Sequence, residues 1–314
     1  MIPKRARPED ATLGGWLESV LASGRVVHLD REPRGEGTFP KEVVRCRTDD
    51  GRERVLFCKY AAPRGASFGH RGGVGYEAQV YRNILQSSAS STPAFVGSGG
   101  DEASGQWLIL EFLEGAARLA QQPARMPAAA AWLGRFHGLN AQRMSDPELG
   151  FLTVYDPAYY LGWAERTLSL AANRREAVPW LPRLCNVFAD VVIALLDAEQ
   201  TVIHGEYTVK NVMVDGTCIR PTDWETAAIA PGEIDLVCLI DMWDPELAQA
   251  CTDAYITARW PAGAPVDFAE RLLAAELYLH FRWLGDGPGT IMGKERIVRF
   301  GRLETLATQL GLMS

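Results

Sequence analysis

Hydrophobic positions in the first third of the chain follow the two-residue alternation of half-buried β-strands. Strands are expected at 25–30, 38–47, 53–60, 94–97 and 106–112. The turn Asp49-Asp50-Gly51 joins the second and third strands as a hairpin. Apolar residues at helical spacing predict amphipathic helices over 9–23 and 76–86. The pattern therefore predicts an antiparallel sheet with accompanying helices.

Beyond about residue 114 the pattern changes to the helical period of 3.6 residues. Helices are expected at 128–140, 158–172, 181–196, 246–260, 267–284 and 293–310. Asp267 with Glu270 predicts a capping box for the fifth of these, and Gly311 predicts a C-cap after the last. We therefore expect an α+β protein with two lobes. Residues 1–113 form a small N-lobe with an antiparallel sheet plus helix, and residues 114–314 form a larger, mainly helical C-lobe.

Composition agrees with a globular enzyme of two lobes. The 314 residues are enough for two cores, and 47% apolar with 23% charged residues is ordinary for a soluble protein. The net charge of −7 argues against nucleic acid as the main partner, because phosphate binding needs clustered cations. The acidic balance fits a cationic small molecule weakly, and solubility alone accounts for most of the acids.

The sequence predicts a cytoplasmic location without a membrane partner. Six scattered cysteines lack a Cys-x-x-Cys pair and mostly lie in apolar runs, so reduced, buried thiols are expected rather than disulfides or metal ligands. The first ten residues include basic side chains but no apolar region follows them, so no secretory signal is expected. No run reaches the roughly 18 apolar residues that a membrane span needs.

Two charged residues fall on faces that the pattern predicts to be buried. Alternation puts Lys59 on the side of Val55 and Phe57, where an unpaired cation would be costly. Glu77 shares the apolar face of the helix 76–86. Alternatives are an edge-strand lysine that reaches solvent and a first-turn glutamate that favours the helix N-terminus. Their coincidence favours an ion pair between Lys59 and Glu77.

Two glycine-containing loops occur in the same region. Gly35 and Gly37 suit either a loop that covers phosphates or ordinary turn chemistry. The glycine-dense stretch 65–75 lacks the strand-turn-helix context of a dinucleotide-binding motif. We expect a flexible connector there, with a mobile flap beside the site as the alternative.

The segment 201–225 carries the residues with the clearest chemistry. Glu206 is followed by Asn211 and, after a short hairpin pattern, by Asp223. One carboxylate can accept a proton from an attacking hydroxyl, and an amide with a second carboxylate can bind Mg²⁺ through hard oxygen atoms. The order therefore predicts a magnesium-nucleotide site.

These residues form known motifs. His-Gly-Glu-x-x-x-x-Asn occupies 204–211, and Asp-Trp-Glu follows at 223–225. With the strand lysine and the helix glutamate, they resemble the aminoglycoside phosphotransferase family of the protein-kinase-like superfamily. The stretch Leu-Gly-Arg-Phe-His-Gly-Leu at 133–139 is similar to the family's Leu-x-x-Leu-His-x-Leu helix, and 232–236 to its glycine-then-Asp-Leu element. The resemblance spans about residues 25–285 and implies a bilobal kinase-like fold.

The resemblance implies that the nucleotide is bound by the N-lobe, with ATP as the cofactor. Lys59 would contact the α- and β-phosphates, and Glu77 would position Lys59. The strand that ends near Phe112 would lead into a hinge. The backbones of Glu111 and Leu113 would then hydrogen-bond adenine.

The resemblance also implies the catalytic machinery of the C-lobe motifs. Asn211 and Asp223 would bind Mg²⁺, the second cofactor. Asp235 would brace the catalytic loop, and His204 would serve the structure of that loop. Glu206 stands in the place of the catalytic aspartate.

Glu206 is the main departure from the family, whose usual motif is His-Gly-Asp. The extra methylene displaces the carboxylate by about 1 Å if nothing else moves. Phosphoryl transfer depends chiefly on positioning and charge stabilisation and asks little of the base. Because a glutamate keeps the charge and the acceptor atoms, we expect an active variant rather than an inactive one.

Acceptor-binding residues are expected in the helical lobe. The candidates are the run Asp241, Trp243 and Asp244, and the aromatic residues Tyr159, Tyr160 and Trp163. Acids beside a tryptophan could hold a cationic amino sugar through charge-assisted hydrogen bonds and ring stacking. Equally, Asp244 could cap the following helix and the aromatic residues could belong to the core.

The first functional hypothesis is an ATP- and Mg²⁺-dependent kinase that phosphorylates a hydroxyl of a small molecule, such as an aminoglycoside-like antibiotic or another sugar-like or amino-alcohol metabolite. The second is a non-catalytic, pseudokinase-like protein that binds a nucleotide or metabolite, motivated by Glu206. A protein kinase is disfavoured, since no recognisable activation segment lies between Asp223 and Asp235. The sequence leaves the oligomeric state open.

Overall fold

The computed structural model describes residues 7–21, 24–35, 39–61, 70–86, 91–101, 105–172, 178–286 and 294–310. The chain forms two compact units. Unit 1 comprises Met1–Gln122 with Lys210–Thr226, and unit 2 comprises Pro123–Val209 with Ala227–Ser314. This division differs from the single boundary between residues 113 and 114 that the hydrophobic pattern predicts, because one later segment joins the N-terminal part.

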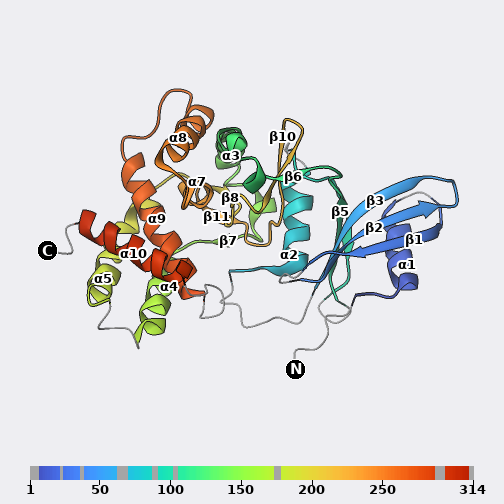
Figure 1. Ribbon diagram of the computed structural model, residues 1–314, viewed down its shortest axis with the longest axis horizontal. Helices are drawn as coiled ribbons and strands as arrows, with labels where there is room; N and C mark the ends of the chain where they lie inside the picture. Colours follow the sequence, from blue (N-terminus) through green and yellow to red (C-terminus); the bar gives the residue numbers. More distant parts are fainter. Residues whose placement is uncertain are drawn as a thin grey trace. The chain divides into compact units, whose positions relative to one another are not determined.

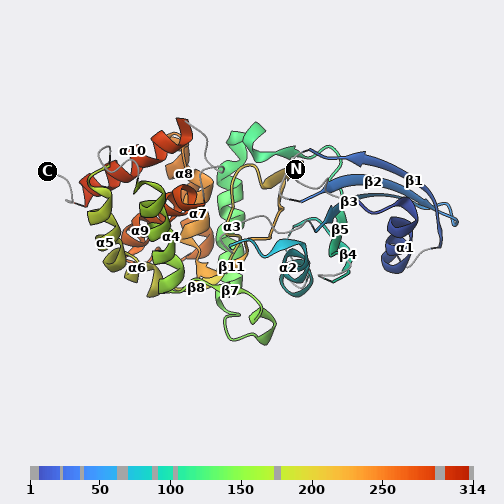
Figure 2. The same ribbon diagram turned by 90° about the horizontal axis from the view of Figure 1, so that it is seen from below.

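Unit 1 is built on a five-stranded antiparallel sheet with the order β1-β2-β3-β5-β4 (Figure 1). Its strands are β1 Val26–Pro33, β2 Lys41–Thr48, β3 Glu53–Tyr60, β4 Phe95–Gly99 and β5 Trp107–Glu111. Helix α1 (Asp10–Leu21) packs on the sheet (Figure 2), burying Leu13 and Leu17 in a cluster with Leu56 and Ile109. The predicted hairpin turn is present, with Gly51 at a φ of 81°.

Helix α2 (Gly73–Val80) continues directly into one π-helical turn, Tyr81–Leu85. The helix predicted over 76–86 therefore begins three residues earlier and ends in a widened turn. Its predicted buried face is confirmed, since Glu77, Val80 and Ile84 are almost completely buried. A carboxylate thus lies among apolar side chains and requires a partner.

A second sheet explains why Lys210–Thr226 belongs to unit 1. Its three strands have the order β10-β9-β6. β9 (Val212–Asp215) forms a hairpin with β10 (Cys218–Pro221) and pairs on its other edge with β6 (Ala117–Arg118). This pairing joins strands that are far apart in sequence, so the local hydrophobic pattern does not reveal it.

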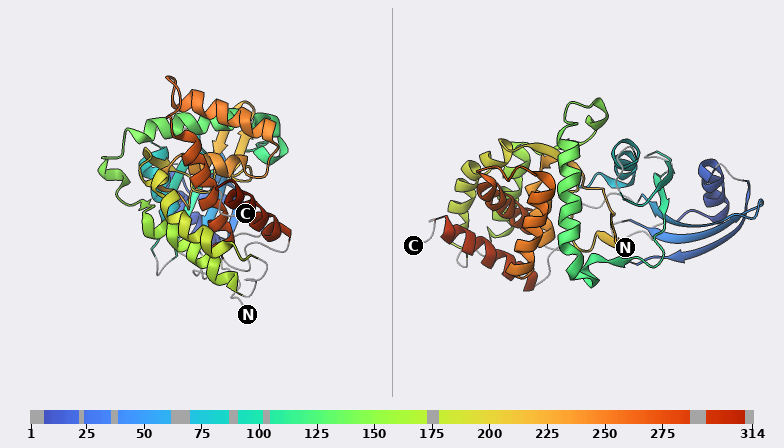
Figure 3. Two further views of the ribbon diagram at one scale, coloured as in Figure 1. Left: turned by 90° about the vertical axis from the view of Figure 1, so that its left-hand side faces the viewer. Right: turned by 90° about the horizontal axis from the view of Figure 1, so that it is seen from above.

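Unit 2 is mainly helical (Figure 3). Its helices are α3 Met126–Ala141, α4 Pro157–Leu170, α5 Leu181–Val191, α6 Ile193–Leu196, α7 Glu233–Ile240, α8 Pro245–Arg259, α9 Phe268–Gly285 and α10 Lys294–Gln309. α3 runs along α8 at close range, because a Cβ atom at Gly134 would lie 2.6 Å from the carbonyl oxygen of Tyr255. A small sheet of β7 (Thr153–Val154), β11 (Ala228–Pro231) and β8 (Gln200–Ile203) completes the unit.

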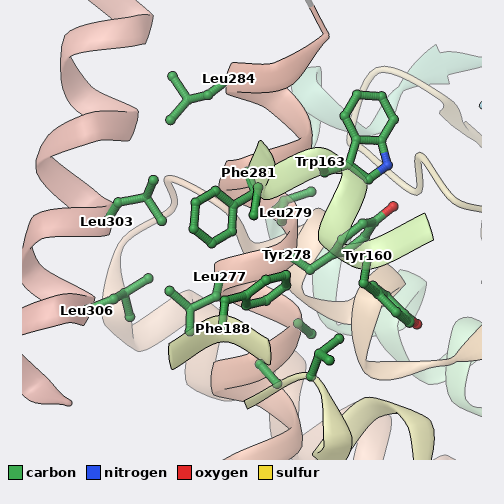
Figure 4. Close-up of a cluster of buried hydrophobic side chains, with 14 of the residues drawn as sticks. Tyr160, Trp163, Phe188, Leu277, Tyr278, Leu279, Phe281, Leu284, Leu303 and Leu306 are labelled. Atoms are coloured by element: carbon green, nitrogen blue, oxygen red, sulfur yellow. The ribbon is translucent and has the colours of Figure 1, made fainter. Parts of the chain in front are cut away.

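The core of unit 2 gathers side chains from α4, α5, α9 and α10 (Figure 4). Phe188 and Phe281 meet with ring centroids 4.9 Å apart. Tyr160 and Trp163 are completely buried in the same cluster. The alternative in which these aromatic residues belong to the core is therefore confirmed for both.

The fold class predicted from the sequence is confirmed: an antiparallel sheet with helices in the N-terminal part precedes a mainly helical part. Two details are corrected. The helix expected over 181–196 is interrupted at Val192, giving α5 and α6. Among the described residues, the Asp267 carboxylate makes no cap bond at α9 and instead pairs with Arg271, one turn later. The capping-box prediction is therefore wrong.

Three features predicted from the sequence fall partly or wholly outside the described residues. Gly311, the expected C-cap, lies outside them, as do Gly37 and residues 65–69 of the glycine-dense stretch 65–75. Within the described part of the chain, no helix is long and apolar enough to cross a membrane. The six cysteines are free thiols, four of them buried.

Candidate active site

Unit 1 contains a cavity of about 380 Å³ between its two sheets and helix α2. All six residues that the resemblance assigns to nucleotide and metal line this cavity: Lys59, Glu77, Glu111, Leu113, Asn211 and Asp223. Apolar walls come from Phe57, Leu110 and Met213, and further cations from Arg34, Lys41, Arg118 and Lys210. A cavity with apolar walls at one place and clustered cations suits a ligand with an aromatic base and phosphates.

Lys59 is surrounded by three carboxylates. Its Nζ lies 2.6 Å from Glu77 Oε2, 2.5 Å from Asp223 Oδ1 and 3.6 Å from Glu225 Oε2. The expected Lys59–Glu77 ion pair is therefore present. Burial alone lowers the pKa of Lys59, but the three carboxylates outweigh it and raise the pKa. The lysine remains a cation although its side chain is only 8% exposed.

Two of the carboxylates around Lys59 also accept hydrogen bonds from other residues. Glu77 Oε1 accepts the backbone N–H of Trp224 at 3.1 Å, which ties α2 to the Asp-Trp-Glu motif. Arg71 donates to Glu225 at 2.7 Å. Burial raises the pKa of Glu77, reinforced by the negative charges of Asp223 and Glu225 and opposed by Lys59. The cluster carries more negative than positive charge, which favours an added cation.

Asp223 is the most exposed acid of this cluster, with a side chain 42% exposed. Its backbone is in the left-handed region with a φ of 69°, an unusual conformation for a residue other than glycine. The preceding Thr222 donates its N–H and its hydroxyl to the carbonyl oxygen of Asn211, at 2.8 and 3.0 Å. The turn after β10 thus brings the backbones of Asn211 and Asp223 together.

The donor set of Asn211 and Asp223 fits Mg²⁺. Mg²⁺ typically takes one or two carboxylates and completes its shell with water and phosphate oxygens. Asp223 and the Asn211 side chain are hard oxygen donors for Mg²⁺, and the cations of the same lining can meet phosphate oxygens. These residues therefore fit a magnesium-nucleotide complex.

The Glu111 side chain, at the end of β5, has a structural role. Its carboxylate accepts from Arg220 at 3.2 Å and from the N–H of Ala94 at 3.0 Å. The N–H of Glu111 donates to the carbonyl oxygen of Ala94, and the carbonyl oxygen of Leu113 accepts from Ala116.

In unit 2, the loop after β8 carries His204, Gly205 and Glu206. Asp235, in the first turn of α7, accepts the N–H of His204 at 2.6 Å and the N–H of Gly205 at 2.8 Å. These are the bracing contacts that the resemblance implies for Asp235. Gly205 has a φ of 79°, which suits glycine at this sharp turn.

Glu206 is held by an arginine that sequence reasoning did not single out. Arg282 Nη2, on α9, donates to Glu206 Oε1 at 2.5 Å, and Arg282 Nη1 donates to the carbonyl oxygen of Gly205 at 3.2 Å. Burial lowers the pKa of Arg282, but Glu206 and nearby tyrosines raise it well above its ordinary value. The Glu206 carboxylate therefore has a permanent cationic partner.

A second polar network lies beneath the loop. His137 Nδ1 contacts the hydroxyl of Tyr255 at 3.0 Å, and His137 Nε2 contacts Asp235 at 3.3 Å. Burial lowers the pKa of His137, although Asp235 opposes this shift. Arg259 donates to Tyr255 and to Glu233, so the network continues to the end of α8. The histidine of the Leu-x-x-Leu-His-x-Leu element thus supports the loop through Asp235.

The acids proposed for acceptor binding are engaged in unit 2. Asp241 pairs with Arg299 of α10 at 2.8 Å. Asp244 is the N-cap of α8 and accepts the N–H of Leu247 at 2.9 Å, which is the alternative that the sequence left open. Trp243 is half-buried in the turn before that helix. Tyr159 is also half-buried, and it stacks on Tyr155 at a centroid distance of 3.8 Å.

Sequence reasoning missed three residues of these clusters: Arg71, Glu225 and Arg282. Glu225 was visible as the last residue of Asp-Trp-Glu, but the motif assigned it no role. The charge of Arg282 on an otherwise apolar stretch of α9 was the signal that could have been followed, since a buried arginine needs an acid. Its partner is 76 positions away in sequence.

Comparison with known proteins defines the class. The model of the phosphotransferase enzyme family matches residues 42–266, and the chain belongs to this family. A sequence search of curated proteins found no match.

Three solved structures share the fold at low identity. A choline/ethanolamine kinase family protein from Mesorhizobium loti is 16% identical, with a TM-score of 0.61 and coverage of 95% of this chain and 94% of that one. A choline kinase from Cryptosporidium parvum is 12% identical, with a TM-score of 0.64 and coverage of 97% and 98%. A spectinomycin phosphotransferase in complex with ADP and spectinomycin is 11% identical, with a TM-score of 0.58 and coverage of 98% and 100%.

Proposed function

We propose that this phosphotransferase transfers the γ-phosphoryl group of ATP, with Mg²⁺, to a hydroxyl group of a small molecule. The observation that carries this proposal is the cavity of unit 1. Two strands, a helix, a hinge and the turn after β10 each contribute a residue of the kinase-like motif to its lining. Chance would not bring six matched residues from separate segments into one cavity.

The nucleotide would be oriented by the charges and backbone groups of unit 1. The adenine would contact the backbone of Glu111 and Leu113 and pack on the apolar wall that includes Met213. Lys59, positioned by Glu77, would contact the phosphates. Asn211 and Asp223 would hold Mg²⁺, which when bound neutralises charge on the phosphates.

The catalytic carboxylate would be Glu206. It would orient the acceptor hydroxyl so that the acceptor oxygen forms a bond to the γ-phosphorus while the bond from phosphorus to the β-γ bridging oxygen breaks. ADP then leaves, and the hydroxyl proton passes to the Glu206 carboxylate. Positioning matters more than basicity in this reaction, which is consistent with a carboxylate paired to Arg282.

For the acceptor, we propose a sugar-like or amino-alcohol compound, with aminoglycoside-like antibiotics as one class. Related folds act on different compounds, because the three solved structures include two of the choline kinase type and one bound to spectinomycin. In unit 2, the negative charges of Glu206 and Asp241 are already balanced by arginines. A polycationic acceptor therefore gains less from these acids than their number suggests, and neutral hydroxyl compounds belong in any test.

The test incubates the wild-type protein with Mg²⁺-ATP and a mixed panel of aminoglycosides, amino-alcohols, nucleosides, macrolides and sugars. Mass spectrometry detects any product that gains one phosphoryl group. Glu206→Gln should lower the rate of that transfer by about 10²–10⁴-fold, the usual contribution of a positioned acid–base group. Glu276→Gln is the matched control, because Glu276 also pairs with an arginine in unit 2 and lies on α9.

The competing function is a pseudokinase-like protein that binds a nucleotide or metabolite without transfer. It would be favoured if wild type and Glu206→Gln bind Mg²⁺-ATP equally and neither phosphorylates any acceptor in the panel. The pairing of Glu206 with a buried arginine does not separate the two functions, because a buried charge needs a partner whether or not it reacts. The cytoplasmic location stays a prediction from the sequence.

A further inference from the structure

The Arg282–Glu206 pair is buried and lies wholly within unit 2. The Arg282 side chain is 3% exposed and the Glu206 side chain 11%. In such surroundings an ion pair is strong, but removing either partner leaves an uncompensated charge. A pair of this kind is therefore conspicuous at a loop that carries a catalytic motif.

Arg282 contacts two successive residues of the loop rather than the carboxylate alone. Nη1 donates to the carbonyl oxygen of Gly205 and Nη2 to Glu206 Oε1. The guanidinium also lies 5.5 Å from the centroid of the Trp283 ring. Because the planar guanidinium offers donors in a fixed fork, these contacts set the direction of the glutamate side chain as well as its charge.

Glutamate needs such a contact more than aspartate does. Its additional methylene adds one rotatable bond, so an unrestrained carboxylate samples more positions. The hydrogen bond from α9 removes that freedom at one oxygen, Oε1. The loop itself is held from the other side by Asp235, which accepts the amides of His204 and Gly205. Backbone and side chain are thus anchored separately.

We propose that Arg282 is the positioning residue for Glu206, and that the two form a coupled unit that replaces the shorter aspartate of the His-Gly-Asp motif. The arginine holds Oε1, and the Glu206 carboxylate receives the acceptor hydroxyl. This inference rests on the proposed function. During transfer the acceptor oxygen–phosphorus bond forms, the bridging bond to ADP breaks, and the hydroxyl proton moves to the Glu206 carboxylate. Arg282 keeps all its protons throughout.

The kinetic test compares Arg282→Met, Arg282→Lys and Arg271→Met with wild type. Arg271 is the matched control, since it also lies on α9 and pairs with Asp267 at 2.9 Å, with Glu233 3.9 Å away. Arg282→Met should lower kcat by about 10²-fold while the KM for ATP stays within about twofold. Arg282→Lys keeps the charge and should recover part of the loss.

A second measurement tests the pair without relying on activity. Urea midpoints are measured for Glu206→Gln, Arg282→Met and the double variant. The double variant should lose less than the sum of the two single changes, because each single change leaves its buried partner uncompensated. Strict additivity would overturn the coupling.

The outcomes separate this inference from the proposed function. If the wild type phosphorylates an acceptor but Arg282→Met matches it in kcat, the positioning role is overturned while the kinase stands. If the wild type phosphorylates nothing in the panel, the proposed function fails, and the urea midpoints still decide whether the two side chains are coupled. Equal losses of kcat in Arg282→Met and Arg271→Met would also overturn it, since they would indicate a general effect on α9.

Discussion

The two units bury charges of opposite sign at their candidate sites. In unit 1 a buried cation, Lys59, lies among three carboxylates and the cluster keeps an excess of negative charge. In unit 2 the carboxylate of Glu206, in the loop after β8, is neutralised by one buried arginine. The three carboxylates around Lys59 thus outnumber the two cations that pair with them, Lys59 and Arg71, whereas the pair in unit 2 is balanced.

This difference explains which region should bind and which should only orient. An acidic cluster with one exposed member, Asp223, gains from a divalent cation and the phosphates that accompany it. A balanced pair gains little from further charge, and its value lies in holding one carboxylate in one direction. Changes in unit 1 should therefore affect nucleotide binding, and changes around Glu206 should affect turnover.

Of all these variants, Asp223→Asn should lower phosphoryl transfer the most. A small effect would contradict the assignment of nucleotide binding to unit 1. The substitution removes a hard anionic donor from the cluster, and transfer should fall by about 10³-fold as Mg²⁺-ATP affinity falls. The measurement is transfer rate against Mg²⁺ concentration. Asp215→Asn is the control, because Asp215 is also 42% exposed and pairs with an arginine in unit 1, outside the cavity lining. Equal effects of both changes would contradict the assignment of Asp223.

Asp235→Asn tests the brace of the catalytic loop. The Asp235 carboxylate accepts hydrogen bonds from two backbone N–H groups. An asparagine amide has only one acceptor oxygen, and its NH₂ group would face the second backbone N–H, donor against donor. Stability should fall by about 3 kcal/mol, the scale of charge-assisted hydrogen bonds lost in a buried site. Urea unfolding measures the loss. The surface variant Asp253→Asn on α8 should change the midpoint little, and a similar loss there would remove the case for a specific brace.

Much of this organisation could be predicted from the sequence, for identifiable reasons. Apolar and polar residues alternate along the strands of unit 1, so these strands could be predicted. Lys59 and Glu77 are charged residues on apolar faces, so their ion pair could be predicted as well. Asn211 and Asp223 follow a motif with fixed spacing. By contrast, the pairing of β6 with β9 depends on distant strands, and it moved Lys210–Thr226 into unit 1.

The contact of Arg282 with Glu206 could not be predicted from the sequence. No spacing rule connects α9 with the loop after β8, since their contact exists only in the folded unit. The capping box at Asp267 failed for a related reason, because Arg271 one turn later competes for the carboxylate. Local patterns predict elements and motif residues, whereas ion pairs between distant elements require the tertiary structure.

The pH dependence of unit 2 should reflect His137. Burial lowers its pKa, so the unfolded chain binds a proton at a higher pH than the folded one does. Stability from this group is therefore present above the ordinary histidine range and is lost as the pH falls through and below about 6.5. His137→Gln should lose about 1–2 kcal/mol at pH 8 but show a flatter decline towards acid.

Denaturation midpoints at several pH values check the role of His137. The exposed His28→Gln is the control and should keep the wild-type slope. If His137→Gln and wild type decline in parallel between about pH 7.5 and pH 5.5, the buried imidazole is not the group responsible.

The smallest effect should come from Asp244→Ala. Loss of the cap bond to Leu247 should cost about 1 kcal/mol, while the KM for the acceptor stays unchanged. A rise in that KM with no change in stability would instead return Asp244 to the acceptor site.

The most direct test of the account measures Mg²⁺-ATP affinity and phosphoryl transfer on the same preparation of Glu206→Gln. The division of tasks between the two units predicts a Kd for Mg²⁺-ATP within about twofold of wild type and a transfer rate lower by at least about 10²-fold. An unchanged transfer rate, or a loss of nucleotide binding as large as the loss of transfer, would contradict it.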